Sequence, residues 1–358
     1  MNLDIFKVEQ WMTIHEGNAK YKLTDTCMKP LTWQELQAYD TNHLLDTITL
    51  DYGDITGSKA VKEEILSLYN TGDIDNITCI PGCLLANQTV MDTLLEKGDT
   101  VICYTPGYQQ FYDYPKSLSC NVIKLPLYEE NDWQPSIDDL EDAMQNDVKL
   151  IIMNNPSNPT GVIFEETYIN KMIELATKQN TWILADEVYR GLNNQPSMSD
   201  LYDKAISTSS LSKIYSVAGI RFGWIKGSKE IIEKINYRRD YTFISCGPLS
   251  DMCAQIVLLH KEEILKKNLE IIEKNKEVVR KWLEENPSFS LVMPKSGTVG
   301  FLKYDGDISS EELATTLQEK YGVMFVPGCC FDDENHLRLT FTCENEVMSE
   351  GLELFKNF

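Results

Sequence analysis

The stretch KLIIMNNPSNPTG (residues 149–161) joins an almost continuously apolar run to a short polar loop. Such a run is typical of a parallel strand that is buried on both faces of a sheet. In the loop, Pro156 and Pro159 restrict the backbone on both sides of Asn158. We therefore predict an inner strand over 149–155, with a rigid polar loop at its carboxyl end. The alternative is an ordinary strand-to-helix connection.

Similar apolar runs occur on both sides of this stretch, and amphipathic segments separate them. Strands that alternate with helices indicate a mainly parallel sheet, because parallel strands need a long crossover connection. The predicted fold class is α/β, with a large domain whose mainly parallel sheet is covered by helices on both faces. The expected strands are 100–104, 121–127, 149–155, 181–187 and 204–212, and the expected helices are 84–96, 135–145 and 165–180.

The pattern changes after about residue 228. Here we expect a long charged helix that is bent or broken once, three short strands and a further helix, which together predict a smaller α+β domain. The large domain is assigned to residues 46–228, and the small domain to 229–358 together with an N-terminal segment, 1–45. The elements expected in the small domain are the helices 259–285 and 309–322 and the strands around 290–295, 300–304 and 336–341.

The composition disfavours several classes of function. The 358 residues carry a formal net charge of −22, which disfavours nucleic acids and anionic membranes as partners, because both require clustered Lys and Arg. The ten cysteines are scattered without a metal-type CxxC pair, and four histidines are few for a metal cluster, so we expect no metal site. No apolar run approaches the roughly 18 residues of a membrane span, and no signal peptide is recognisable. We expect a cytoplasmic protein with reduced cysteines.

Two charged residues stand out at the ends of predicted strands. Asp186 closes the apolar run TWILAD (181–186), where a carboxylate is costly unless it is paired or hydrogen-bonded; the alternative is a helix N-cap. Lys213 lies in SSLSKIYSVAGIR (209–221), among hydroxyl groups and eight residues before Arg221. We interpret Lys213 as a reactive amine near a bound phosphate, with a solvated loop lysine as the alternative.

A fourth segment, IPGCLLANQ (80–88), places Gly82 before a predicted helix. The free N–H groups at a helix N-terminus can hold a phosphate, although a single glycine before a helix is a weak signal. All four segments lie at the carboxyl ends of predicted strands or just beyond them. Open α/β sheets bind their ligands at this edge.

In this order and context, NPTG and SLSK with an arginine eight residues on resemble the fold-type I pyridoxal-phosphate (PLP) aminotransferases. The similarity is to the class I and II, aspartate-aminotransferase-like family, and it extends from about Tyr52 to Arg338. It implies PLP as the cofactor, held as an aldimine by Lys213, whose amine also shuttles the substrate's α-proton. It further implies that Asp186 keeps the pyridine nitrogen of PLP protonated.

Other residues match contact positions of the family. Arg338 matches the arginine whose fork grips the substrate's α-carboxylate, and Tyr108 matches the aromatic residue that stacks on the pyridine ring. The remaining matches are Asn158 and Tyr189 at the phenolic oxygen of PLP, with Asn158 also bordering the substrate, Ser210 and Arg221 at the phosphate, Ser212 beside Lys213, and the backbone of Cys83 and Leu84 at the helix N-terminus.

Tyr52, with Gly57 five residues later, matches a tyrosine that reaches the phosphate in the neighbouring subunit. The resemblance therefore implies a homodimer with shared active sites. A core aromatic residue is the alternative interpretation of Tyr52.

The activity that the resemblance implies is amino transfer between an α-amino acid and a 2-oxo acid. The same residues would serve a β-lyase acting on a cysteine conjugate, a decarboxylase or a cyclising enzyme. A PLP-binding transcription regulator fits less well, because we recognise no DNA-binding module before Tyr52 and the net charge is −22.

The chain departs from the family's pattern near its N-terminus, where KYKLTDTCMKPLTWQEL (20–36) lacks the family's glycine-rich stretch. Leu84 and Leu85 also replace small or hydroxyl residues of the phosphate loop. Arg238 and Arg239 have two interpretations, a contact to the distal carboxylate of a dicarboxylic substrate or ion pairs with the abundant acids.

Overall fold

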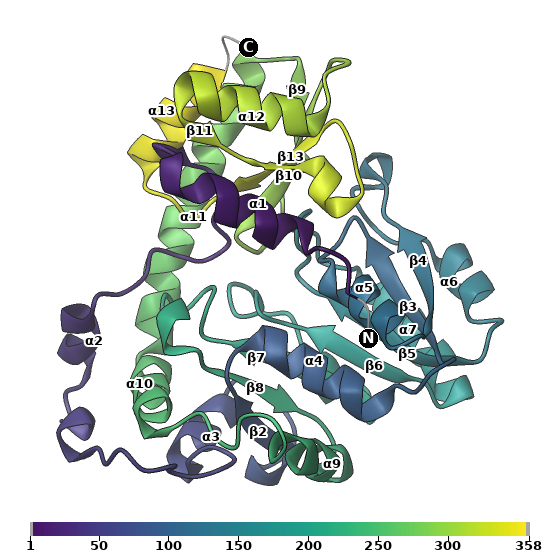
Figure 1. The fold of residues 1–358 in the computed structure, drawn as a ribbon, viewed down its shortest axis with the longest axis vertical. Helices are drawn as coiled ribbons and strands as arrows, with labels where there is room; N and C mark the ends of the chain where they lie inside the picture. The colour runs from purple at the N-terminus through teal and green to yellow at the C-terminus, as the bar shows by residue number, and fades with distance from the viewer. Residues whose placement is uncertain (1–2, 356–358) are drawn as a thin grey trace.

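A seven-stranded sheet forms the centre of the larger part of the computed structural model, which describes residues 3–355 (Figure 1). Only β8 runs antiparallel to its neighbours, β2 and β7, and the other strand pairs are parallel. The predicted α/β class with a mainly parallel sheet is therefore confirmed. The strands, in spatial order, are β2 (Ile77–Ile80), β8 (Gly223–Lys226), β7 (Ala205–Ser210), β6 (Trp182–Asp186), β5 (Val148–Asn154), β3 (Thr100–Thr105) and β4 (Asn121–Pro126).

The five strands β3 to β7 lie within two residues of the ranges expected from the sequence. The sequence analysis missed β2 and β8, which have four residues each and carry no clear alternation of apolar and polar side chains. Both are buried along their whole length, so their burial pattern resembles that of the parallel strands.

Helices cover both faces of this sheet, as predicted. Alternate residues of β5 enter different cores: Leu150 and Ile152 pack in the cluster with α4, α5 and α9, whereas Ile151 and Met153 pack in the cluster with α6 and α7. Burial on both faces explains the continuous apolar run. The covering helices are α4 (Cys83–Leu94), α5 (Gln110–Ser117), α6 (Ile137–Ala143), α7 (Glu166–Gln179) and α9 (Lys229–Arg239), with the short α8 (Met198–Leu201) beside β7.

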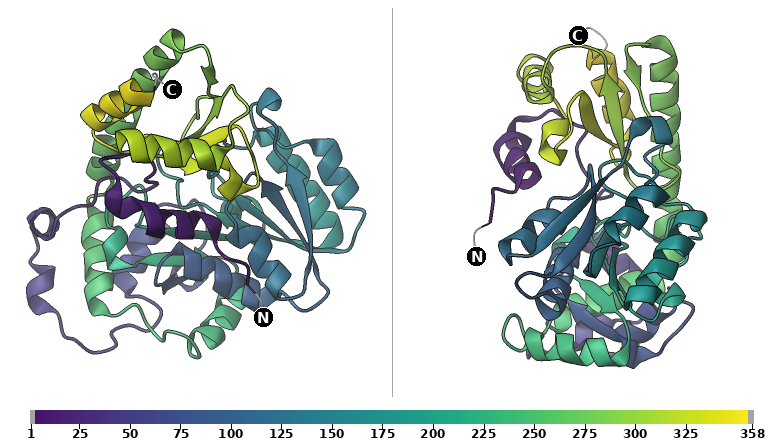
Figure 2. Two further views of the ribbon diagram at one scale, coloured as in Figure 1. Left: turned by 45° about the horizontal axis from the view of Figure 1, so that its top comes forward. Right: turned by 90° about the vertical axis from the view of Figure 1, so that its right-hand side faces the viewer.

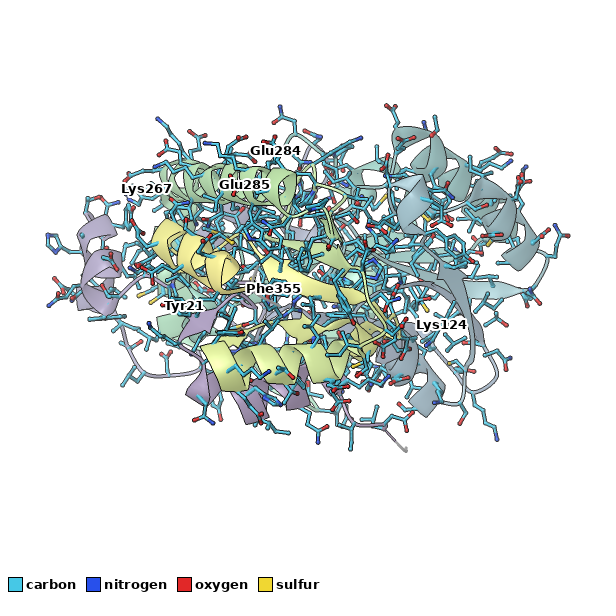
Figure 3. All side chains as sticks on the ribbon, turned by 90° about the horizontal axis from the view of Figure 1, so that it is seen from above. Tyr21, Lys124, Lys267, Glu284, Glu285 and Phe355 are labelled. Carbon is cyan, nitrogen blue, oxygen red and sulfur yellow. The ribbon has the colours of Figure 1, made fainter. Side chains whose placement is uncertain are left out.

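A second, four-stranded antiparallel sheet forms the core of the other part of the molecule. This sheet is flanked by helices. In Figure 3 the exposed Glu284 and Glu285, at the end of the helix over residues 261–285, lie further out than the buried Phe355. The strands are β12 (Val326–Pro327), β13 (His336–Thr340), β10 (Val299–Tyr304) and β9 (Phe289–Ser290), and the helices are α11 (Lys261–Glu285), α12 (Ser310–Tyr321) and α13 (Asn345–Phe355).

Two details of the expected small domain were wrong. Helix α11 runs without interruption, and the break lies before it, at His260, which separates it from α10 (Pro248–Leu259). The segment 290–295 is not a strand beyond Ser290. Its Pro294 lacks the N–H group that a strand would use for pairing.

The N-terminal segment lies across the two parts of the molecule (Figures 1 and 2). Helix α1 (Lys7–His15) is beside α12, where the His15 ring hydrogen-bonds to Gln318 at 2.7 Å. The short β1 (Tyr21–Lys22) pairs in parallel with β11 (Val323–Met324). Further along, α2 (Trp33–Tyr39) contacts α10, which also packs on α3 (Lys59–Leu66). The domain limits drawn from the sequence stay predictions.

No helix within residues 3–355 is long and apolar enough to cross a membrane. All ten cysteines of the chain lie in this range and are free. The cytoplasmic location itself stays a prediction.

A buried ion pair links strand β8 of the large sheet to helix α8. Lys226 on β8 contacts Asp200 on α8 at 3.0 Å, and the two side chains are only 3% and 4% exposed. Asp200 also accepts a hydrogen bond from the Asn70 backbone N–H. We therefore expect Asp200→Asn to lower the free energy of unfolding by about 3–5 kcal/mol, because it leaves the Lys226 charge buried without a counter-charge. Urea unfolding followed by circular dichroism measures this change.

Asp203→Asn, three residues on at an exposed position, is the matched control and should change stability by less than about 0.5 kcal/mol. Equal unfolding midpoints for the two variants would contradict the role given to this ion pair.

Candidate active site

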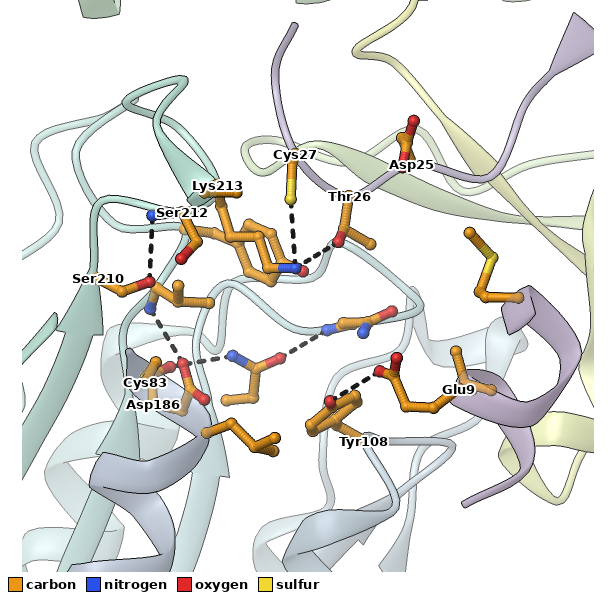
Figure 4. Close-up of a pocket in the computed structure, with 18 of the residues that line it drawn as sticks. Glu9, Asp25, Thr26, Cys27, Cys83, Tyr108, Asp186, Ser210, Ser212 and Lys213 are labelled. Carbon is orange, nitrogen blue, oxygen red and sulfur yellow. Dashed lines mark hydrogen bonds between the residues drawn. The ribbon is translucent and has the colours of Figure 1, made fainter. Parts of the chain in front are cut away.

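A cavity with a volume of about 430 Å³ lies at the carboxyl ends of the inner strands (Figure 4). Five parts of the chain line it: the ends of β5, β6 and β7 with their following loops, the segment from β3 into α5, the N-terminus of α4, the N-terminal segment, and β13. Eleven of the twelve residues predicted as site residues line this one cavity, although they are spread from Cys83 to Arg338. The eleven are Cys83, Leu84, Tyr108, Asn158, Asp186, Tyr189, Ser210, Ser212, Lys213, Arg221 and Arg338.

Lys213 follows β7 and points into the cavity (Figure 4). Its Nζ donates a hydrogen bond to Thr26 Oγ1 at 2.6 Å and lies 3.6 Å from Cys27 Sγ. Burial opposes the charged form of this amine, but the nearby ionisable Tyr189 and Cys27 outweigh burial, so the pKa of Lys213 is raised. The amine is thus held at a defined place by the N-terminal segment.

Asp186 ends β6 and is 5% exposed. Its Oδ2 accepts a hydrogen bond from Asn87 Nδ2 at 2.7 Å, and its Oδ1 accepts one from the Val188 N–H at 3.0 Å. Burial raises the pKa of Asp186, and these two donors oppose the rise because they favour the carboxylate. The helix N-cap alternative is wrong, because the residues after Asp186 form a turn and the next helix, α8, begins only at Met198.

The loop after β5 connects this centre to β13. Asn154 Oδ1 accepts from the backbone N–H of Asn158 at 2.8 Å, and Asn154 Nδ2 donates to the carbonyl of Asp186 at 3.0 Å. Asn158 Oδ1 in turn accepts from Arg338 Nη1 at 3.2 Å. A strand end, a loop and a strand of the second sheet are thereby joined in one polar network.

Arg338 is 3% exposed and lines the cavity. Its Nη2 donates to the carbonyl of Thr24 at 2.9 Å, whereas its Nε has no hydrogen-bond partner among the described residues. Burial lowers the pKa of this guanidinium. An anion is the group that such a buried, partly unpartnered cation would bind.

The N-terminus of α4 faces Arg221. Gly82 precedes the helix with φ of +89°, and a Cβ at this position would lie 2.6 Å from Arg221 Nη2. Arg221 Nη1 also lies 3.4 Å from Ser212 Oγ, and Ser210 Oγ accepts from the Ser212 N–H at 3.3 Å. Backbone N–H groups, hydroxyls and a guanidinium together form a donor set suited to a phosphate.

Two tyrosines also line the cavity. The Tyr108 hydroxyl donates to Glu9 Oε1 at 3.1 Å, and its ring contacts Phe6 with centroids 5.0 Å apart. Tyr189 is 3% exposed, and burial raises its pKa. The roles assigned to both residues stay predictions.

Tyr52 does not line the cavity of its own chain, and its side chain is 65% exposed. Its carbonyl accepts a hydrogen bond from Ser245 Oγ at 2.7 Å. Tyr52 is therefore not a core aromatic residue, and the contact to a second subunit stays a prediction.

Sequence reasoning missed part of the site. Asn87 hydrogen-bonds to the Asp186 carboxylate. In the sequence, Asn87 is recognisable only as a polar residue on the helix that follows Gly82. The N-terminal wall had no signal, because the segments that line the cavity there match no motif. They contribute Val8, Glu9, Met12, Glu16, Thr24, Asp25, Thr26 and Cys27.

Arg238 and Arg239 do not line the cavity. Arg239 is 4% exposed, and its Nη1 donates to Thr78 Oγ1 at 2.8 Å and to Asn236 Oδ1 at 2.9 Å. The hydrogen bonds of Arg239 thus lead to neutral groups at β2 and α9 and not toward a substrate.

Comparison with known proteins gives a consistent family match. The sequence profile described as "Aminotransferase class I and II" matches residues 17–355. The solved structure of a PLP-dependent aminotransferase from Streptococcus suis 89-1591 is 37% identical, covers 100% of this chain and 98% of its own, and has a TM-score of 0.95. The PLP-dependent cyclase OrfR shares the fold at 22% identity, with a TM-score of 0.91 over 100% of this chain and 97% of its own.

Two relatives found by sequence carry different names. Capreomycidine synthase from Streptomyces vinaceus is 23% identical over 354 residues, which cover 96% of this chain and 91% of that protein. An aspartate aminotransferase from Pyrococcus horikoshii is 24% identical over 306 residues, which cover 82% of this chain and 78% of that protein.

The contact between Gly82 and Arg221 can be tested with alanine. Gly82→Ala places a methyl group against the guanidinium and should displace it from the phosphate position. We expect the affinity for PLP to fall at least about tenfold, which is ~1.4 kcal/mol. Fluorescence titration of the cofactor-free protein with PLP measures this affinity.

Gly98→Ala is the matched control, because Gly98 also has a positive φ of +94° but a Cβ there meets no atom within 4 Å. Both substitutions carry the same kind of backbone strain, so only the steric effect differs. Equal PLP affinity in the two variants would remove Gly82 and Arg221 from the phosphate site.

Proposed function

Because this chain belongs to the class I and II aminotransferases and its cofactor is PLP, we propose that it moves an amino group between an α-amino acid and a 2-oxo acid. One observation carries this proposal: Lys213, Asp186 and Arg338 converge on a single cavity from three separate parts of the chain. These are an amine, a carboxylate and a guanidinium, the groups that amino transfer on this cofactor requires.

The residues of the cavity fit PLP. At one end, Arg221 occupies the space that a side chain at position 82 would fill, beside the unpaired N–H groups of the first turn of α4. At the other end, the Nε of Arg338 has no partner among the described residues. An anionic group thus has donors at both ends, a phosphate at the first and a carboxylate at the second.

When bound, PLP supplies a ring that stabilises negative charge at the substrate's α-carbon. We assign to Asp186 the holding of a proton at the pyridine nitrogen. Asn87 and the Val188 N–H support this role, because they hydrogen-bond to the ionised form and orient it. An amide at position 186 would keep the shape and lose this charge.

We assign two tasks to Lys213: its Nζ binds the cofactor covalently, and after release it accepts the α-proton and returns it. Thr26 and Cys27 contact Nζ and would orient the released amine. We assign to Arg338 the binding of the substrate's α-carboxylate, which orients the α-carbon toward Lys213. Asn158 already fixes one arm of the guanidinium by its hydrogen bond.

The experiment that tests this function is a half-reaction with single amino acids on the PLP-loaded protein. Amino transfer gives one 2-oxo acid per active site, converts the cofactor to its amine form and stops until a 2-oxo acid is added. Lys213→Ala should abolish this turnover, and borohydride reduction of the unmodified protein should fix the cofactor on the peptide that contains Lys213. Fixation on a different lysine would refute the assignment.

The same experiment distinguishes the alternative reactions. A β-lyase releases pyruvate and ammonia continuously from a cysteine conjugate, whereas a decarboxylase releases carbon dioxide. A cyclising enzyme, as the name of the OrfR neighbour describes for that protein, returns a product that retains its nitrogen.

We further propose that the protein works as a homodimer, with Tyr52 reaching the phosphate site of the second subunit. Tyr52 lies outside its own cavity in an apolar exposed region. Its segment adjoins the start of α10, where Gly53 approaches Pro248 and Tyr52 accepts from Ser245. The large exposed side chains of this region are Leu50 (87%), Tyr52 (65%), Tyr241 (92%), Ile244 (40%) and Leu249 (46%).

Subunit mixing tests the shared site. A mixed dimer contains one Lys213→Ala chain and one Tyr52→Phe chain. The site built on the Tyr52→Phe chain then has its own intact Lys213 and receives an intact Tyr52 from the Lys213→Ala chain. After subunit exchange, the mixture should be more active than the average of the two parents. Activity equal to that average after confirmed exchange, or a fully active monomer in light scattering, would place Tyr52 outside the site.

A further inference from the structure

The cavity carries negative charge that the proposed chemistry does not use. Glu9, Glu16 and Asp25 line it through the N-terminal segment. In Figure 4, Glu9 and Asp25 lie on the side opposite Ser210 and Cys83, away from the predicted phosphate position. The part of the cavity left for a substrate side chain is therefore bordered by carboxylates.

These carboxylates are only partly satisfied by the protein. Glu9 accepts the Tyr108 hydroxyl through Oε1 at 3.1 Å. Glu16 is paired with Lys22 at 3.3 Å. Within residues 3–355, no hydrogen bond or ion pair to the Asp25 carboxylate is found. Its pKa is raised by partial burial and then by Glu16, while the charges of Lys22, Arg338 and Lys213 oppose the rise. A further cation beside Asp25 would also favour its ionised form.

The cations of the cavity are already assigned. Among the described residues, Lys213, Arg221 and Arg338 are the basic residues that line it. Lys213 is assigned to the cofactor, Arg221 faces the predicted phosphate position, and Arg338 is assigned to the α-carboxylate. A distal carboxylate of a dicarboxylic substrate would consequently find acids rather than a basic partner in this chain.

The wall that carries Glu9 is fixed in place. Trp11 Nε1 donates to the carbonyl of Phe325 at 2.9 Å, and the Lys7 backbone N–H donates to Gln109 Oε1 at 2.8 Å. Lys7 Nζ also contacts Asp332. Helix α1 is thus attached to both parts of the molecule, so the carboxylate of Glu9 is positioned before a substrate arrives.

We propose that the amino donor is an α-amino acid with a cationic side chain, a guanidinium or an ammonium, which binds between Glu9 and Asp25 while Arg338 holds its α-carboxylate. Arg338 supports the α-carboxylate part of this assignment, because it is buried, lines the same cavity and leaves Nε without a partner among the described residues. The cavity thus offers a guanidinium for the α-carboxylate and carboxylates for the side chain, which match the two opposite charges of such a substrate. This inference rests on the proposed function and adds the substrate class.

The test compares amino donors that differ in charge but hardly in shape. L-Arginine and L-citrulline form one pair, L-lysine and L-norleucine form the second, and L-glutamate represents the dicarboxylic class. For the PLP-loaded protein we expect kcat/KM for at least one cationic donor to exceed that of its neutral partner by ~10-fold or more, because 1.4 kcal/mol of charge-pair energy corresponds to a factor of ten. Glutamate should be the poorest donor.

Variants locate the effect. In Glu9→Gln the amide oxygen still accepts the Tyr108 hydroxyl, so the charge is removed with little change in shape, and Asp25→Asn acts likewise. Each should raise KM for the cationic donor several-fold and leave kcat and the neutral donor nearly unchanged, and the double variant should bring the ratio within each pair close to one. Glu319→Gln removes the same charge from an exposed position on α12 outside the cavity and should leave the ratio intact.

The outcomes separate this inference from the function on which it rests. If no amino acid of any class converts the cofactor, the proposed function fails. If glutamate or the neutral donors react better than the cationic ones, amino transfer stands and the inference is overturned. A cationic preference that persists in the double variant would also overturn it, because Glu9 and Asp25 would then not be its source.

Discussion

The burial of one carboxylate at the end of a parallel strand is the constraint on which this active site depends. Asp186 ends β6 in the middle of the sheet, where desolvation opposes its charge. The fold must therefore deliver hydrogen-bond donors to it, and it does so from two directions, with Asn87 on α4 and the Val188 N–H beyond the strand. The helix that supplies Asn87 also directs its N-terminus at the cavity. Stabilisation of Asp186 and preparation of a phosphate position are thus two results of placing one helix.

The same constraint extends to the loop after β5. Asn154 donates to the Asp186 carbonyl and accepts from the Asn158 backbone, so the loop is attached to the neighbouring strand end. Through Asn158 it reaches Arg338, which belongs to the other sheet. A displacement of the four-stranded sheet would break this contact, and for that reason the two parts of the chain must keep their relative position for a substrate to bind between them.

The sequence predicts a site residue well where its side chain comes directly after a strand that can be recognised in the sequence. Asn158 and Asp186 follow or end apolar runs, Lys213 follows a predicted strand rich in hydroxyl groups, and parallel strand ends meet at one edge of a sheet. Arg338 was identified by resemblance, since its strand alone does not reveal which cavity it borders. Glu9 and Asp25 were beyond prediction because long-range contacts place them: β1 pairs with β11 over only two residues, which leave no periodicity to recognise. The short β2 and β8 were missed for a similar reason.

The distribution of roles along the chain has a physical basis. Every residue assigned to the cofactor, apart from Tyr52, is on the seven-stranded sheet side, where burial on both faces makes displacement costly. The residues that face the part of the cavity left for a substrate side chain come mostly from α1 and the segment around β1. These segments contribute few strand hydrogen bonds. Substitutions at Glu9 or Asp25 therefore alter the charge of the substrate space without disturbing the sheet. A family that keeps its reaction while changing its substrates would be expected to vary at such a place, and in this chain that segment is the one without the family's glycine-rich motif.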